Sequence, residues 1–306
     1  MNILIRADSS SAIGTGHIKR DLVLAKEFRD DNIIFAVQDL NGNINSEIEK
    51  AGHAIKILKN NSFKELDNLI KKLEIDMIII DNYEIDYSFE KKLKKENPNL
   101  KIFVLDDTYK KHFCDILLNH NIYADEKKYK NKVPKGCEIR CGAKYTLLRD
   151  EFKKIKKSPI TTHQSPTTIF LSMGGADNKN LNIKILKVLK KYKKNIKINL
   201  LTTSANKNLE ELKKYCKSKK WIDLHIDSKE VAKLMQESSF AIITPSVTAN
   251  EAYFLGLRMI VIKTAKNQHQ MYKYLSKKGY FALKKFDKKE LKKSIDKILG
   301  VVKWKS

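Results

Sequence analysis

Short apolar runs alternate with amphipathic stretches along most of this chain, and this alternation restricts the fold more than any other feature. Apolar runs of this length are typical of strands buried on both faces, and the stretches between them are typical of helices that cover a sheet. Regular succession of strand and helix indicates a parallel, doubly wound α/β sheet. In the first half we expect strands at residues 1–7, 32–37, 54–58, 75–81, 101–105 and 116–119.

Residues 158–166 interrupt the alternation. This segment contains two prolines and several hydroxyl residues and has no hydrophobic period, so it is predicted to be a linker. We therefore expect two Rossmann-like domains, residues 1–157 and 167–306, facing each other across a cleft. Ligands of such domains bind at the carboxyl ends of the strands. The alternation restarts with strands expected at residues 168–172, 197–202, 223–225, 240–244 and 259–263.

Length and composition restrict the class of protein. The chain has 306 residues, of which 42% are hydrophobic, enough for two modest cores. No stretch approaches the roughly 20 apolar residues that span a bilayer, and the first residues enter a strand directly, without a signal peptide. The four cysteines include no C-x-x-C pair, so zinc is disfavoured and free thiols are expected. We expect a cytoplasmic protein with no cofactor, no bound metal and no membrane span; the sequence leaves its oligomeric state open.

The formal net charge of +25 raises the alternative of a nucleic-acid-binding protein. Only six of the 61 basic residues are arginine, however, and arginine is the residue that reads bases and grips phosphate in bidentate fashion. We interpret the lysines as solvated surface that concentrates an anionic substrate, and expect no nucleic-acid partner. Tight binding of nucleic acid with a steep salt dependence would support the alternative.

The loop after the first strand carries the sequence Gly-Thr-Gly-His at residues 14–17 and opens a helix. A helix N-terminus attracts anions, a glycine such as Gly16 lets a ligand approach the backbone, and His17 can take a proton from water. The spacing is not that of a dinucleotide site, because Lys19 stands where the third glycine would be. Taken alone, the motif fits a tight turn with a solvated histidine equally well. Asp8 is expected to orient His17 or touch a sugar; its structural alternative is capping the loop.

Two loops of the second half also follow apolar strands directly. One contains Gly174 and Gly175, and the other runs from residue 245 to 252 and opens a helix. In the second loop the N–H groups of Ser246, Val247 and Thr248 can hold a phosphate, and Glu251 can accept hydrogen bonds from sugar hydroxyls. The structural alternatives are a simple turn at the glycines and a helix cap at the hydroxyl residues.

Several ordered motifs resemble the UDP-2,4-diacetamido-2,4,6-trideoxy-β-L-altropyranose hydrolases of bacterial pseudaminic acid synthesis. The resemblance spans both halves and fades after about residue 280. Its motifs are Arg6, Asp8, Ser9 and Ser10; Ile13, Gly14, Gly16, His17, Ile18 and Arg20; residues 79–83; Asp106 and Asp107; His112 and residues 114–119; residues 140–142; Tyr145, Leu147, Leu148, Arg149, Glu151 and Phe152; residues 173–175; and residues 250–252.

The resemblance implies a GT-B-like fold and metal-free hydrolysis of the sugar–phosphate bond of a UDP-linked diacetamido sugar, in the synthesis of surface glycans. The family's catalytic base aligns with His17, and water activated there would attack the anomeric carbon with inversion. UDP needs little protonation to leave, so one base and good anion stabilisation are sufficient. The alternative function is a GT-B glycosyltransferase, in which the hydroxyl of an acceptor replaces water.

Three further residues of the first half are candidate substrate ligands. Tyr83 is expected to contact the sugar or the water, Asn119 an acetamido group, and Arg20 a phosphate. The structural alternative for Tyr83 is packing, for Asn119 it is ending its strand, and for Arg20 it is an ion pair with a surface acid. A metal held by Asp106 and Asp107 is disfavoured, because adjacent carboxylates are more typical of turns. The remaining histidines lack the spacing of metal ligands: His112, His120 and His269.

Overall fold

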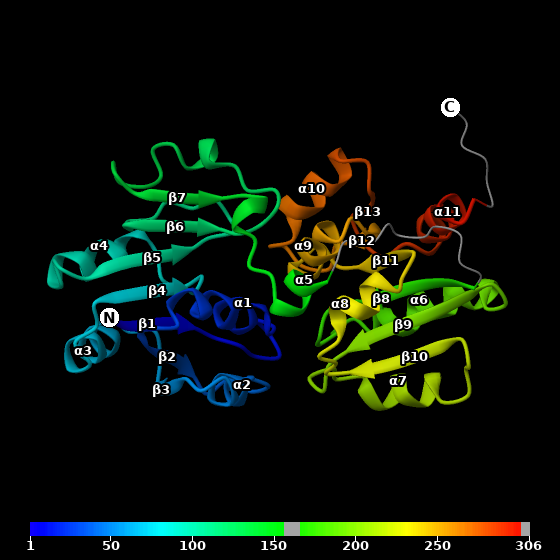
Figure 1. Cartoon of the computed structure of the whole chain (residues 1–306), viewed down its shortest axis with the longest axis horizontal. Helices are drawn as coiled ribbons and strands as arrows, with labels where there is room; N and C mark the ends of the chain where they lie inside the picture. Colours follow the sequence, from blue (N-terminus) through cyan, green and yellow to red (C-terminus); the bar gives the residue numbers. More distant parts are fainter. Residues whose placement is uncertain (156–165, 301–306) are drawn as a thin grey trace. The chain divides into compact units, whose positions relative to one another are not determined.

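The computed structural model describes residues 1–155 and 166–300, and the chain divides into two units, Met1–Leu148 and Arg149–Ser306 (Figure 1). The division lies before the boundary expected at residue 157. Helix α5 (Asp150–Lys154) contacts α8 (Val231–Gln236), so residues that follow Leu148 pack with the second half of the chain. The predicted linker at 158–166 lies outside the described residues, apart from Pro166.

The first unit is a seven-stranded parallel sheet with strand order β3-β2-β1-β4-β5-β6-β7. Its strands are β1 (Asn2–Ala7), β2 (Asn32–Gln38), β3 (Ala54–Leu58), β4 (Met77–Asp81), β5 (Lys101–Leu105), β6 (Ile116–Asn119) and β7 (Glu138–Cys141). Its helices are α1 (Gly16–Ala25), α2 (Asn45–Lys50), α3 (Phe63–Lys72) and α4 (Tyr87–Glu96), with short 3₁₀ turns at Lys26–Phe28, Glu126–Tyr129 and Ala143–Tyr145.

Both faces of this sheet are buried, which explains the continuous apolar runs. Ile3 and Ile5 of β1 pack in one core cluster with Ile18 of α1 and Ile48 of α2. Leu4, between them, is also fully buried, and neighbouring side chains of a strand point to opposite faces. The predicted parallel sheet is therefore confirmed. The edge strand β7 is not among the predicted strands, because its sequence is largely polar and only partly buried.

The second unit is a six-stranded parallel sheet with strand order β10-β9-β8-β11-β12-β13. Its strands are β8 (Thr167–Ser172), β9 (Ile196–Thr202), β10 (Ile222–Ile226), β11 (Phe240–Ile243), β12 (Arg258–Ile262) and β13 (Phe281–Leu283). Besides α5 and α8, its helices are α6 (Leu181–Leu189), α7 (Leu209–Cys216), α9 (Val247–Phe254), α10 (His269–Lys277) and α11 (Lys288–Ile298), with a 3₁₀ turn at Lys190–Tyr192.

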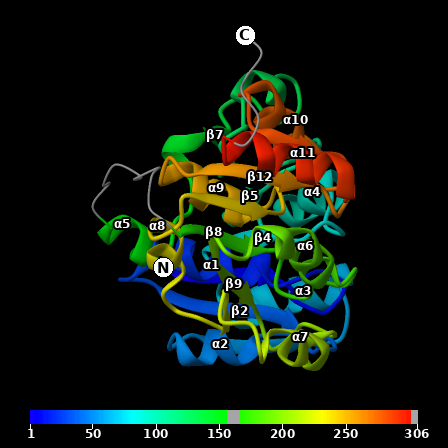
Figure 2. The ribbon, with the colours of Figure 1, turned by 90° about the vertical axis from the view of Figure 1, so that its right-hand side faces the viewer.

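Helix α6 contacts both α7 and α11, and the three helices share a core cluster with the sheet (Figure 2). Each of these helices contributes at least one buried leucine to that cluster: Leu186 of α6, Leu212 of α7 and Leu291 of α11. Helix α9 instead packs on β11 and β12. The second Rossmann-like sheet is thus confirmed as well, and only the three-residue edge strand β13 is missing from the prediction.

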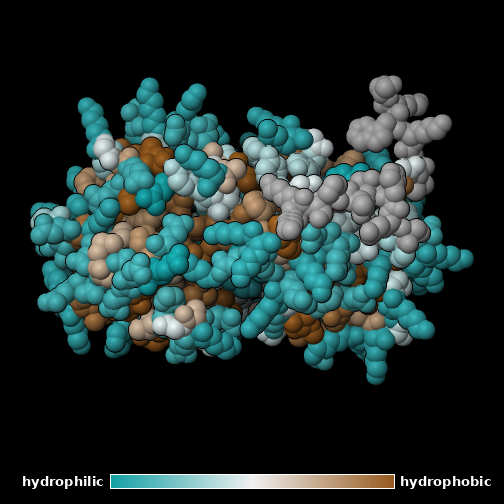
Figure 3. Space-filling model, viewed as in Figure 1, coloured by the Kyte–Doolittle hydropathy of each residue, from teal (hydrophilic) through white to brown (hydrophobic). Residues whose placement is uncertain are grey.

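Hydrophilic side chains extend from much of the surface in view, as the lysine content predicts (Figure 3). Over residues 1–155 and 166–300, none of the helices combines the length and the apolar character that crossing a membrane requires. In the same ranges no cluster of three or more His, Cys, Asp or Glu side chains has the arrangement of a metal site. The four cysteines are free thiols.

Candidate active site

The loop between β1 and α1 is folded back on itself. Ser10 and Gly14 exchange backbone hydrogen bonds, and the Ser10 hydroxyl accepts from the N–H groups of Ala12 and Ile13. Gly14 has a φ of +91°, a conformation that favours glycine. An added Cβ at Gly16 would meet no atom within 4 Å, so the backbone is open where α1 begins. The loop thereby fixes the start of α1, and with it His17.

His17 is oriented by Asp81, the last residue of β4. The Nδ1 atom lies 2.9 Å from Asp81 Oδ1 and 3.0 Å from the carbonyl oxygen of the same residue. Both oxygens only accept, so Nδ1 carries the proton and donates it. In the neutral ring Nε2 is then an acceptor, which is the tautomer that a general base requires.

Arg20, one turn after His17 on α1, holds Asp81 from the other side. Its Nε lies 2.6 Å from Asp81 Oδ2, and its Nη2 bonds Oδ1, which makes a buried bidentate pair. Burial alone would raise the pKa of Asp81, but the charges and hydrogen bonds of Arg20 and His17 hold it well below its usual range. Asp81 is therefore an anion at neutral pH.

Two further buried titratable side chains, Asp21 and His120, interact with this pair. Burial, followed by the charge of Asp81, raises the pKa of Asp21 well above its ordinary value. Burial, followed by the charge of Arg20, lowers the pKa of His120 to about 3. Within the described residues, neither carboxyl oxygen of Asp21 and neither ring nitrogen of His120 has a hydrogen-bond partner. His120 is therefore neutral at pH 7, whereas Arg20 and Asp81 form the charged pair beside it.

Tyr83 lies beside His17. The two rings meet edge to face with centroids 5.0 Å apart. The Tyr83 hydroxyl donates to Asp107 Oδ2 at 2.8 Å, and Arg20 Nη1 approaches the same oxygen at 3.4 Å. The structure therefore brings together four side chains, two from α1 and two from the loops that follow the neighbouring strands β4 and β5: His17, Arg20, Tyr83 and Asp107.

Asp8 and Asn119 have different surroundings from those expected. Asp8 does not orient His17; its carboxylate accepts from Arg6 Nη1 at 2.7 Å and from the Gln38 N–H at 2.8 Å. Asn119 is fully buried, and its Nδ2 donates to the Tyr129 hydroxyl at 3.0 Å. The sequence does not separate Asp8 from Asp81, since both follow apolar strands. The contact with His17 that was expected of Asp8 is made by Asp81, and Asp8 and Asn119 are hydrogen-bonded to other side chains of the protein.

A second buried network stabilises the loop after β5. His112 Nδ1 lies 2.7 Å from Glu90 Oε1, and Nε2 lies 3.8 Å from Asp106 Oδ1, an ion-pair distance rather than a hydrogen bond. The Tyr129 hydroxyl donates to Asp106 Oδ2 at 2.7 Å. Burial alone would lower the pKa of His112, but the two carboxylates raise it to about 9. This histidine is protonated at neutral pH and structural.

In the second unit, the glycine pair after β8 forms a tight turn. Gly174 has a φ of +85°, and a Cβ on Gly175 would lie 2.9 Å from Thr203 Oγ1. Both positions therefore favour glycine for structural reasons. Asp177 closes the turn, because its two oxygens accept from the N–H groups of Leu181 and Asn182 at 2.8 and 2.9 Å. The start of α6 is thus occupied by a side chain of the protein itself.

The start of α9 is different. Ser246 occupies the N-cap position, but its hydroxyl lies 3.0 Å from Thr244 Oγ1, and no side chain of the described residues caps the helix. Ser246, Val247 and Thr248 are partly exposed. An uncapped helix N-terminus with accessible N–H groups is suited to bind phosphate.

Glu251 lies one turn further along α9 and is 3% exposed. Its Oε1 accepts from Arg149 Nε at 2.8 Å. Arg149 is not among the predicted site residues, although it lies in one of the motifs that carry the resemblance, because nothing in the sequence pairs it with a residue 102 positions away.

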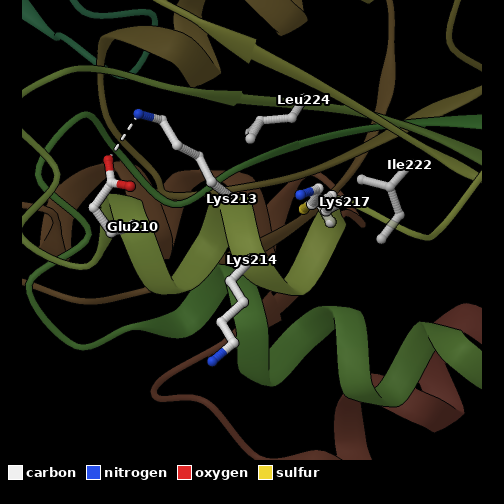
Figure 4. A pocket seen from close by; sticks show the side chains of 7 residues that line it. Glu210, Lys213, Lys214, Lys217, Ile222 and Leu224 are labelled. Atoms are coloured by element: carbon white, nitrogen blue, oxygen red, sulfur yellow. Dashed lines mark hydrogen bonds and ion pairs between the residues drawn. The ribbon is translucent and has the colours of Figure 1, made fainter.

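A hollow of the second unit lies away from these residues. It measures about 540 Å³ and opens between α7 and β10 (Figure 4). Lys213 points toward Glu210 there and forms an ion pair of 2.7 Å. None of the candidate site residues lines this hollow, and exposed lysines do not by themselves form a site. Its lining residues are Glu210, Lys213, Lys214, Cys216, Lys217, Ile222 and Leu224.

Solved structures similar to this chain include glycosyltransferases of the GT-B fold. The crystal structure of Acinetobacter baumannii MurG matches with a TM-score of 0.63 and 12% identity, over 97% of this chain and 90% of that one. The spinosyn rhamnosyltransferase SpnG matches with a TM-score of 0.64 and 10% identity, over 98% of this chain and 92% of that one. At these identities the likeness shows the fold, which is GT-B.

No family model matches the sequence, but curated relatives do. The chain is 30% identical over 289 residues to an uncharacterized protein of Methanocaldococcus jannaschii, covering 90% of this chain and 59% of that protein. It is 43% identical over 280 residues to the UDP-2,4-diacetamido-2,4,6-trideoxy-β-L-altropyranose hydrolase of Campylobacter jejuni, covering 92% of this chain and 98% of that enzyme. The chain therefore belongs to the family of UDP-2,4-diacetamido-2,4,6-trideoxy-β-L-altropyranose hydrolases.

Proposed function

We propose that this protein hydrolyses UDP-2,4-diacetamido-2,4,6-trideoxy-β-L-altropyranose to UDP and the free sugar, in pseudaminic acid synthesis. Its 43% identity to the Campylobacter enzyme supports the reaction. The observation that supports the mechanism is the pairing of His17 Nδ1 with Asp81, because it fixes the ring as a base with Nε2 as the acceptor.

In this mechanism His17 Nε2 takes a proton from water as the water oxygen bonds to the anomeric carbon. The bond between that carbon and the diphosphate oxygen breaks, and its electron pair leaves with UDP. Attack from the face opposite UDP inverts the anomeric centre. Asp81 stabilises the imidazolium that forms, and Arg20 keeps Asp81 ionised.

The leaving group is stabilised by the second unit. The uncapped start of α9, at Ser246, Val247 and Thr248, binds the diphosphate, where negative charge develops. Glu251 accepts hydrogen bonds from the ribose hydroxyls. In the turn formed by Gly174 and Gly175, the nucleotide approaches the backbone on the open side at Gly174. No cofactor or metal takes part in this scheme, since UDP leaves readily as an anion.

The first unit supplies the sugar contacts. Tyr83, 40% exposed beside His17, contacts the sugar or the attacking water, and Arg20 and the open backbone at Gly16 complete this side. We place the reaction in the cytoplasm, where the four thiols remain reduced. The alternative, transfer of the sugar to an acceptor hydroxyl, is favoured by the glycosyltransferase fold alone.

The test is NMR of the purified protein with this UDP-sugar in ¹⁸O-labelled water containing a chelator. We expect free sugar of inverted configuration with ¹⁸O at the anomeric carbon, beside unlabelled UDP. Substrate that stays intact until an acceptor alcohol is added would establish the transferase instead. Label in UDP would mean attack at phosphorus, and loss of turnover with the chelator would contradict the metal-free scheme.

A further inference from the structure

Arg149 begins the second unit and lies in a motif that the proposed function leaves unused. The motif ends with Arg149, Glu151 and Phe152, at the start of the short helix α5. All three side chains pack within the second unit.

The guanidinium of Arg149 is held from several sides. Its Nε donates to Glu251 Oε1 at 2.8 Å, and its Nη1 pairs with Glu151 Oε1 at 2.8 Å. The group lies over the ring of Phe152, which is fully buried, at 5.1 Å from the ring centre. Glu151 is fixed in turn, because its Oε2 accepts from the Ala232 N–H at 2.9 Å, at the start of α8. The position of the guanidinium is therefore set before any ligand binds.

Glu251 depends on this guanidinium because it is buried. A carboxylate removed from water without a counter-charge tends to take up a proton. A protonated carboxyl is a poorer acceptor for the hydroxyl groups that Glu251 is proposed to bind. Arg149 opposes that change and also fixes which way the carboxylate faces.

We propose that Arg149 is a positioning residue for nucleotide binding, which acts through Glu251 on the ribose hydroxyls of UDP. This inference rests on the proposed role of Glu251. It predicts that loss of Arg149 removes recognition of the ribose while leaving recognition of the diphosphate and the base in place.

The chain contains a matched ion pair that serves as a control. In the first unit Arg140 Nε lies 2.8 Å from Glu138 Oε1, the same atom types at the same distance. The Glu138 side chain is 55% exposed, however, whereas that of Glu251 is 4% exposed. An exposed pair contributes little, so Arg140→Ala controls for the loss of an arginine–carboxylate bond as such.

The experiment measures by calorimetry the affinities of the full chain for UDP and for 2′,3′-dideoxy-UDP, and takes their ratio in each variant. Because both nucleotides are tested on one sample, partial misfolding does not change the ratio. Bonds to a charged acceptor predict a wild-type preference for UDP of about tenfold or more. We expect Arg149→Ala and Glu251→Gln each to reduce this preference for UDP to about threefold or less. The double variant should reduce the preference no further, and Arg140→Ala should retain the wild-type preference. Arg149→Lys, which keeps the charge but not the planar fork, should recover part of it.

An unchanged preference in Arg149→Ala overturns the inference and leaves a purely structural ion pair. Equal weakening for both nucleotides overturns it as well. If Arg149→Ala does not fold, an unchanged preference in Arg149→Lys overturns the inference in the same way. A wild-type protein that binds both nucleotides equally would instead refute the ribose role of Glu251, which is a failure of the proposed function and distinct from the other two.

Discussion

Two buried histidines of the first unit face carboxylates, but they differ in how many carboxylates they face. His17 meets one carboxylate, Asp81, through one ring nitrogen. His112 meets Glu90 through one nitrogen and Asp106 through the other. A single carboxylate orients the ring and leaves Nε2 to accept, whereas two carboxylates keep both protons on the ring. In the proposed mechanism, this difference in the number of facing carboxylates distinguishes the base His17 from the structural His112.

The largest effect should follow from replacing His17 itself. His17→Asn retains a polar side chain but removes the base, and we expect kcat to fall by on the order of 10⁴. UDP affinity should change little, because the proposed nucleotide contacts lie in the second unit. Turnover by NMR and UDP binding by calorimetry check this. Equal losses of rate and of UDP affinity would mean that His17 is a binding residue.

The second-largest effect should follow from replacing Asp81, the carboxylate that contacts His17. In Asp81→Asn the side-chain amide can donate to Nδ1, which favours the tautomer protonated at Nε2 and removes the stabilising anion. We expect kcat to fall by roughly 10² to 10³ with KM nearly unchanged. Asp8→Asn is the matched control, since Asp8 also follows a strand and binds an arginine but does not touch His17. A loss of kcat in Asp8→Asn as large as that in Asp81→Asn would remove the distinction.

The smallest effect concerns His112 and appears in stability. Its pKa is raised from 6.5 to about 9 in the folded protein, so the folded state holds this proton more tightly than the unfolded chain. The resulting stabilisation, roughly 3 kcal/mol, is complete below pH 6.5, declines as the pH rises, and is lost above about pH 9.

Urea unfolding of the full chain at pH 6, 7.5 and 9 measures this contribution. His112→Gln should be less stable than the wild type at pH 6, and the difference should shrink toward pH 9. A constant difference across this range would show that the two carboxylates do not hold the proton on His112.

The sequence predicts the strands of both sheets well, but it predicts poorly which side chains contact the candidate site residues. Strands such as β5 and β6 have the predicted bounds, because a run of apolar residues buried on both faces is a local signal. The edge strands β7 and β13 lack that signal, since neighbours rather than their own residues stabilise them. His17 is identifiable from its loop. Its partner lies 64 positions away, and nothing local distinguishes Asp81 from Asp8.

The alignment of two strands has a consequence for how this site can change. Asp81 ends β4 directly beside Ala7, the last residue of β1, whose following loop leads into α1. Side chains alternate between the faces of a sheet, so a shift of β4 by one residue would turn Asp81 away from His17 and leave Ile80 or Asn82 in its place. A core substitution in β1 or β4 that disturbs the pairing of these strands can therefore abolish activity, although every candidate active-site residue is unchanged.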